Sequence, residues 1–134
     1  IMTILVDRTK KEFNLNDSAI ASCDLSNMQF CAVASGGGAT GSMTVGKPTG
    51  QGAIAYAILQ NAPASGAIAE LCVEGFTEWR AHTTFNAGIE LTVHDTNGRC
   101  NTAASGDYVM AIAREASQSA GHAISVHLCG YYKP

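Results

Sequence analysis

The sequence predicts a small all-β protein: a β-barrel or β-sandwich of short strands, with an N-terminal arm and little helix. Two observations carry this prediction. From Met28 onward, short apolar runs are separated by Gly, Asn, Asp and Ser, which is the pattern of a sandwich or barrel. The length of 134 residues fits one domain that buries a hydrophobic core without metals or disulfides. We therefore expect an N-terminal arm over residues 1–27 and a barrel or sandwich domain over residues 28–134.

The arm differs in character from the rest of the chain. Residues 1–6 are apolar, as in a strand, residues 8–13 are charged, and residues 14–17 are polar and typical of a turn. Within the domain, seven apolar runs bounded by turn residues are expected as strands. These runs are residues 29–34, 53–59, 67–73, 76–79, 89–93, 108–113 and 123–128.

Turn residues separate the expected strands. The Asn97-Gly98 pair tolerates positive φ and predicts a tight hairpin after residue 93. Residues 61–66 place proline early and glycine late, as in a loop between strands, and Gly106 and Gly121 precede the last two strands. Each expected strand is therefore short, as in a small barrel or sandwich.

Two segments carry no clear strand pattern. Residues 113–120 contain helix formers over a short span and are interpreted as one helical turn or a bulging loop. Residues 35–52 contain seven glycines and little hydrophobicity, and are interpreted as a long loop or a ragged hairpin. Loops of this length are usually functional or disordered.

Composition argues against several classes of partner. The net charge is −3 and the eight basic residues are scattered, whereas phosphate binding needs clustered Lys and Arg. No apolar stretch approaches the roughly 20 residues that span a membrane, and no signal-peptide pattern is visible at the start. Only 14% of residues are charged, against about a quarter in an average domain. We therefore expect copies of the chain or a partner to cover part of its surface.

Sequences that resemble nucleotide-binding loops lack the context that such loops need. A G-x-G-x-x-G at residues 36–41 and a Walker A-like stretch at residues 41–47 are not followed by a helical pattern. Pro48 stands where the Walker A motif needs the Ser or Thr that binds Mg²⁺. The chain is therefore not expected to bind a nucleotide, and no cofactor is predicted.

The titratable residues also form no catalytic or metal pattern. Neither H-x-x-x-H nor zinc-finger spacing occurs among the histidines, which are His82, His94, His122 and His127. Five cysteines without C-x-x-C spacing are expected as free thiols in a reducing cytoplasm. The regularly spaced Glu70, Glu74 and Glu78 are expected to face solvent from strands. We therefore predict no metal site, no catalytic residue and no enzymatic activity.

An ordered series of phrases from about residue 52 to residue 128 resembles one protein family. The phrases are ILQNAPASG (58–66), VEGFT (73–77), NAGIEL (86–91), DTNGR (95–99), GDYVMAIAREA (106–116) and AGHAISV (120–126). Their order resembles the head decoration, or cement, proteins of tailed bacteriophages, which share similar LQNAP, GD-x-V-x-G-I-A-x-E-A and AG-x-x-I-x-V phrases. The chain departs from this pattern at Met110, where glycine is common, and at His122, where an acidic residue is common.

The resemblance implies a structural virion protein on the outer capsid surface, made in the host cytoplasm. Members of this family are generally symmetric oligomers, often trimers, that bridge neighbouring major capsid proteins after the shell expands. The implied partners are therefore the major capsid protein and further copies of the chain, with neither nucleic acid nor membrane. Binding only to the assembled shell would stabilise it by mass action, and multivalent attachment would strengthen weak single contacts.

The contact with the capsid or a neighbouring subunit is hypothesised to lie in the arm, because an apolar strand with a free edge adds to a partner sheet. Trp79 is interpreted first as a core residue and second as an interface anchor. The candidate contact residues are Ile1, Thr3, Leu5, Arg8, Lys10, Phe13 and Trp79.

Two other functions stay open. The first is another virion surface module, such as a head-fibre base or a protein that binds the host surface or a carbohydrate. That role uses exposed aromatic residues, for which Trp79, Tyr131 and Tyr132 are available. The second is a small hydrolase that uses a cysteine or histidine brought together from distant segments.

Overall fold

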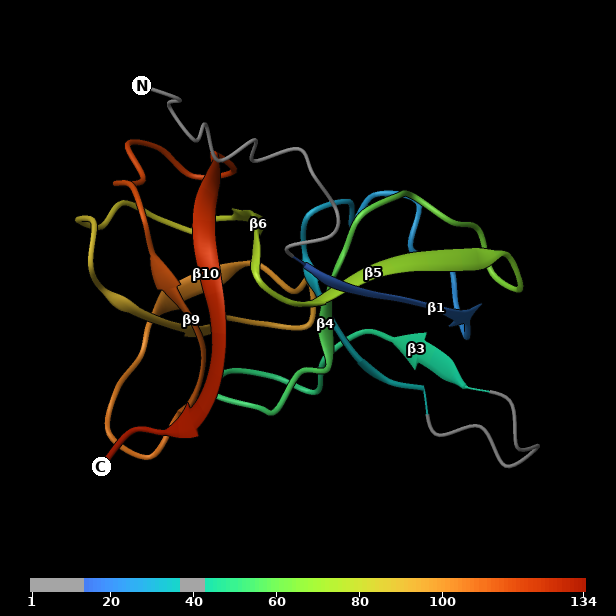
Figure 1. Cartoon of the computed structure of the whole chain (residues 1–134), viewed down its shortest axis with the longest axis horizontal. Coiled ribbons are helices and arrows are strands. Elements are labelled where there is room, and N and C mark those ends of the chain that lie inside the picture. The colour runs from blue at the N-terminus through green and yellow to red at the C-terminus, as the bar shows by residue number, and fades with distance from the viewer. Residues whose placement is uncertain (1–13, 37–42) are drawn as a thin grey trace, which may run out of the picture.

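The computed structural model describes residues 14–36 and 43–134, and these residues form strands and no helix (Figure 1). The prediction of an all-β fold is therefore confirmed. The strands of the described residues are β1 (Leu15–Ala21), β2 (Ala32–Ser35), β3 (Thr44–Gly46), β4 (Ala57–Leu59), β5 (Ile68–Glu74), β6 (Phe76–Arg80), β7 (Glu90–Val93), β8 (Cys100–Thr102), β9 (Tyr108–Ala113) and β10 (Ala123–Tyr132).

The strands form two sheets that follow one another along the chain. Strands β1 to β5 close a barrel in the order β1-β3-β2-β4-β5, with β1 also paired to β5. Strands β6 to β10 form the second sheet in the order β6-β10-β9-β7-β8. A parallel bridge between Ala81, just after β6, and Cys100 in β8 brings the two edges of this sheet together. In Figure 1 the barrel lies on the right and the second sheet, with its long strand β10, on the left.

The chain passes from the barrel to the second sheet at Gly75, which has a φ of 106°. A Cβ atom at this position would lie 2.1 Å from Oδ1 of Asn14, so glycine is required here. The Asn14 side chain donates a hydrogen bond to the Phe76 carbonyl (3.0 Å) and accepts one from the Phe76 N–H (2.9 Å). This amide therefore ties the start of β1 to the start of β6.

Two hydrophobic clusters form the core. One lies inside the barrel, and its largest fully buried members are Leu25, Leu59 and Leu71. The other lies in the second sheet and includes Trp79 and Leu91. Four residues that precede the second sheet in the sequence also belong to this second cluster: Ala32, Ala55, Ile58 and Cys72. The barrel and the second sheet therefore share one continuous packing surface.

The seven predicted apolar runs correspond to β2, β4, β5, β6, β7, β9 and β10. The predicted hairpin at Asn97-Gly98 joins β7 to β8, where the Gly98 N–H donates to the Asp95 carbonyl (3.0 Å). Of the segment 113–120, Ala113 ends β9 and residues 114–120 form a loop and no helical turn, in which an isolated bridge pairs Ser117 with Phe85.

Three strands, β1, β3 and β8, lie outside the seven predicted apolar runs, and two of them bear on the interpretation of a segment. Residues 15–21, assigned to the arm, form β1 and pair with both β3 and β5. The predicted arm of residues 1–27 therefore overlaps the barrel from residue 15 onward, and residues 1–13 lie outside the described residues. In the glycine-rich segment of residues 35–52, β3 pairs antiparallel with β2. Of the two interpretations of this segment, the pairing agrees with the ragged hairpin. The third strand, β8, has only three residues.

Candidate interaction surfaces

A groove of about 440 Å³ runs between the barrel and the second sheet. Strand β6 pairs with β10 only over residues 123–127, so residues 129–132 of β10 carry no strand on that side in the described part of the chain. The groove therefore borders an open strand edge, to which an extended peptide can add. Its lining is Ala55, Tyr56, Val73, Glu74 and Gly75 from the barrel half, with Tyr108, Met110, His127, Leu128, Cys129 and Gly130 from the second sheet.

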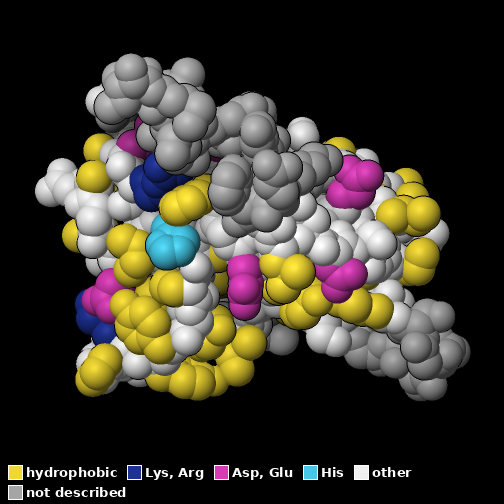
Figure 2. Space-filling view, viewed as in Figure 1, with side chains coloured by type: hydrophobic (Ala, Val, Ile, Leu, Met, Phe, Trp, Pro, Cys, Tyr) yellow, Lys and Arg dark blue, Asp and Glu magenta, His cyan; other side chains and the backbone are white. Residues whose placement is uncertain are grey.

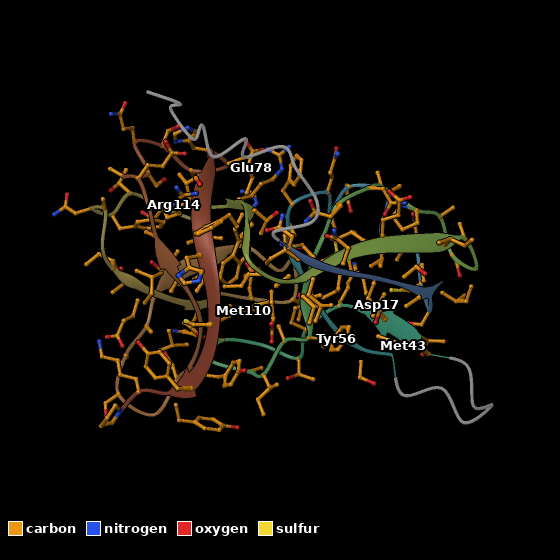
Figure 3. All side chains as sticks on the ribbon, in the orientation of Figure 1. Asp17, Met43, Tyr56, Glu78, Met110 and Arg114 are labelled. Carbon is orange, nitrogen blue, oxygen red and sulfur yellow. The ribbon has the colours of Figure 1, made fainter. Side chains whose placement is uncertain are left out.

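A tyrosine and an aspartate meet beside this groove. The Tyr56 hydroxyl donates a hydrogen bond of 2.8 Å to Oδ2 of Asp17 in β1, and the two side chains point toward one another in Figure 3. The Ser18 N–H donates to the other carboxylate oxygen (2.8 Å). The hydrogen bond from Tyr56 is the main cause that lowers the pKa of the Asp17 carboxyl, and the bond from Ser18 adds to it. The hydrogen bond between Tyr56 and Asp17 also raises the pKa of the Tyr56 hydroxyl. Asp17 therefore keeps its negative charge at the groove.

A second tyrosine–carboxylate contact fixes the end of β10. The Tyr131 hydroxyl donates to Glu90 at the start of β7, and the Lys133 ammonium lies 3.1 Å from the same carboxylate. The hydrogen bond with Tyr131 is the main cause that lowers the pKa of Glu90, and it raises the pKa of Tyr131 to about 12. Lys133 also donates to the Ala103 carbonyl (3.2 Å), so the chain after β10 is held against the second sheet.

An apolar patch lies on the outside of the barrel, and we call it the barrel patch. Its members are Ile20 in β1 and Ile68 in β5, and the exposed Met43 lies just before β3. Ile20 pairs directly with Ile68, and its N–H donates to the Met43 carbonyl (3.0 Å). The side chain of Ile68 is 61% exposed, an unusual position for isoleucine in a barrel strand. A cluster of this kind marks a surface that a partner can cover.

A smaller cluster lies on the second sheet. The Arg114 guanidinium carbon is 4.3 Å from the ring centroid of Phe76, which is a cation–π geometry. The rings of Phe76 and His127 face one another across β6 and β10 with centroids 5.0 Å apart. Figure 2 shows hydrophobic, basic and histidine side chains side by side on this face of the second sheet, and Figure 3 places Arg114 there. Phe76 is therefore an exposed aromatic residue that was not among the predicted contact residues.

Of the seven predicted contact residues, only one lies in the described part of the chain. Trp79 is fully buried, and its indole N–H donates to the Gly98 carbonyl (2.7 Å). It is therefore a core residue with no exposed area for a partner, which corrects its place among the contact candidates. The six arm candidates lie outside the described residues: Ile1, Thr3, Leu5, Arg8, Lys10 and Phe13.

Comparison with known proteins gives a match in fold and none in sequence. No protein-family model matches the chain, and no curated protein matches it. Among solved structures, the chain is similar to the crystal structure of the N base of the head fiber gp8.5 in bacteriophage phi29, with a TM-score of 0.68. This chain has the fold of that fibre base.

The likeness to the fibre base includes both sheets. It covers 86% of this chain and 93% of the fibre-base chain, at 14% sequence identity. The barrel (residues 15–74) and the second sheet (residues 76–132) each make up less than half of the 134 residues. A match over 86% of the chain must therefore include residues of both. In the described residues, no helix is long and apolar enough to cross a membrane.

Proposed function

We propose that the protein is a structural component of a tailed-phage virion and lies on the outer surface of the head. The observation that carries this proposal is the fold match to a phage head-fibre base over nearly the whole of both chains. The sequence supports it independently, because the ordered phrases between residues 52 and 128 resemble head decoration proteins. The exposed barrel patch and the low fraction of charged residues agree with a surface that is covered in an assembly.

The more specific proposal is that the protein cements the expanded head. A symmetric oligomer, as in the family it resembles, would bridge neighbouring major capsid proteins. Because such an oligomer binds the assembled shell and not its separated subunits, binding would stabilise the shell by mass action. Several weak contacts per oligomer would together give firm attachment.

A second candidate function is the base of a head fibre, and the fold match favours it directly. A fibre base also attaches to the capsid but serves to hold a further segment or protein. The two functions therefore differ in one measurable property, which is whether attachment stabilises the shell itself.

Sedimentation with heads tests both functions. Purified protein is expected to co-sediment saturably with expanded heads that lack it, and the heads are then heated. A raised disruption temperature supports cementing, whereas saturable binding with an unchanged temperature supports the fibre base. Absence of binding at micromolar protein contradicts both functions and favours a protein that binds a receptor or a carbohydrate.

The proposal also includes the absence of catalysis. Burial raises the pKa of the Cys31 and Cys72 thiols to about 11 and raises that of Cys100 further. A protonated thiol is a poor nucleophile, so these three cysteines are unsuited to covalent catalysis. Alkylation of the partly exposed Cys23 and Cys129 is expected to leave head binding unchanged, and a loss of binding would place one of these cysteines at the contact with the head.

Deletion of residues 1–13 tests the hypothesised contact of the arm. We expect attachment to heads to weaken by about tenfold or more, because multivalent binding amplifies the loss of one contact per subunit. The body is expected to stay folded, since β1 begins at Leu15 and the Asn14 side chain is retained. Co-sedimentation measures attachment and circular dichroism measures folding.

The matched variant for this deletion is Ile68→Lys, which keeps the whole arm and places a charge in the barrel patch. The side chain of Ile68 is largely exposed, so the fold should tolerate lysine. If the deletion binds as well as the full chain while Ile68→Lys loses binding, the contact lies on the barrel and the arm hypothesis is wrong.

A further inference from the structure

Three polar side chains meet where the two edges of the second sheet come together. His82 follows β6 and the bridge residue Ala81, His94 directly follows β7, and Asp95 begins the turn to β8. The His82 N–H donates to the Cys100 carbonyl (2.8 Å) and the His94 N–H donates to the Arg99 carbonyl (2.7 Å). The backbone therefore holds both histidines in place, although 11 residues separate them in the sequence.

The donor atoms of the three side chains lie close together. The imidazole rings of His82 and His94 are stacked, with centroids 3.5 Å apart and an angle of 15° between the planes. Oδ2 of Asp95 lies 4.0 Å from Nε2 of His94. Its other oxygen, Oδ1, accepts the Asn97 N–H (2.9 Å), which fixes the carboxylate with Oδ2 toward the histidines. One donor atom from each of the three residues lies within 4.8 Å of the others.

The other ring nitrogen of His94, which is not the one beside Asp95, has no partner in the described residues. Nδ1 of His94 is buried and makes no hydrogen bond. A buried ring nitrogen without a partner is uncommon, because its desolvation costs free energy that a hydrogen bond or a metal would offset. All three side chains are half-buried, so the site is shielded but open to a small ion.

We propose that His82, His94 and Asp95 bind a divalent transition-metal ion of the zinc type. Two imidazoles and one carboxylate form a known three-residue zinc ligand set, in which water takes the fourth position. Imidazole nitrogens favour zinc, copper or nickel over magnesium and calcium, which prefer oxygen ligands. Tetrahedral bonds of about 2.0–2.1 Å place neighbouring donors about 3.3 Å apart. The nitrogen lone pairs of the stacked rings lie in two nearly parallel planes, so the rings must turn about their Cβ–Cγ bonds to direct both lone pairs at one ion.

The ion would have a structural role. His82 belongs to the β6 edge of the second sheet, whereas His94 and Asp95 belong to the β7–β8 edge. An ion held by all three would cross-link these edges beside the Ala81–Cys100 bridge. Because the ion binds the folded chain and not separated strands, it would stabilise the folded state.

Titration of the metal-free protein with ZnCl₂ tests this proposal. We expect one ion per chain by calorimetry and, at a hundredfold excess over Kd, a rise in Tm of roughly 10 °C. The variants His82→Ala and His94→Ala are each expected to weaken binding at least about tenfold. The matched control is His122→Ala, which removes an exposed histidine outside the cluster and should bind zinc like the parent.

Three further measurements distinguish binding at this site from a folding defect or from binding elsewhere. The Tm of each variant without metal shows whether it folds, and histidine ring nitrogen shifts in NMR show directly whether His82 and His94 become ligands. With Co²⁺ in place of zinc, a thiolate charge-transfer band would assign binding to the partly exposed cysteines, Cys23 or Cys129, and overturn the proposal. Undiminished binding by the two histidine variants, or no binding at micromolar zinc, would also overturn it.

Discussion

Trp79→Ala is expected to lower the free energy of unfolding by about 3–5 kcal/mol, the usual cost of emptying a fully buried tryptophan site. Trp79 has no exposed area and lies in the cluster that joins the second sheet to the barrel. The same cluster contains Leu91, Val93 and Ile124, which lie in paired strands and cannot easily move into the cavity. Urea unfolding followed by circular dichroism measures the effect, because the variant has no tryptophan for fluorescence.

The matched variant for this prediction is Trp79→Phe. It keeps most of the aromatic volume but loses the indole N–H that donates to the Gly98 carbonyl. That carbonyl also accepts the Ala32 N–H (2.8 Å), so it stays hydrogen-bonded in the variant. We therefore expect Trp79→Phe to cost clearly less than Trp79→Ala. Equal losses would mean that the hydrogen bond, and not the packing, is the main contribution of Trp79.

Gly98→Ala is expected to destabilise the protein by about 3 kcal/mol or more, through backbone strain and a steric clash together. Gly98 has a φ of 73°, which costs any residue with a Cβ atom free energy. A Cβ atom there would also lie 2.3 Å from the Ala32 carbonyl oxygen. This oxygen belongs to β2, which is paired with both β3 and β4, so it cannot move away without breaking the barrel.

Gly88→Ala separates these two contributions. Gly88 has a φ of 83°, but a Cβ atom there would have nothing within 4 Å. We expect it to cost only the backbone term, about 1–2 kcal/mol. The difference between the two alanine variants, measured by urea unfolding, then gives the cost of the close approach between Gly98 and Ala32. A difference near zero would contradict the steric argument.

The sequence predicted the strands whose apolar runs were long enough to stand out. Strands β9 and β10 are examples, since both contain continuous apolar stretches next to glycine turns. Strand β1 was missed because its first four residues, Leu15 to Ser18, are exposed and three of them are polar. Its place in the barrel depends on hydrogen bonds to β5, a strand about 50 residues later, and no local pattern reports such pairing.

The interaction surfaces were harder to predict than the strands. Ile20 and Ile68 both lie in strands, and only the register that pairs them shows that they form one exposed patch. The cluster of His82, His94 and Asp95 was missed for a similar reason. No spacing rule links residues 82 and 94, and the Ala81–Cys100 bridge brings them together. Trp79 could be assigned to the core or to an interface from sequence, and its burial decides for the core.

The single passage of the chain at Gly75 has a consequence for biosynthesis. The strands of the barrel all precede this residue, and so do the residues of the barrel's own core. A ribosome therefore delivers every strand of the barrel before the first strand of the second sheet. The strands of the second sheet then pack against apolar side chains of the barrel that have already been synthesised, including Ala32, Ile58 and Cys72. Growth from the N-terminus thus limits how much apolar surface the incomplete chain exposes to other nascent proteins.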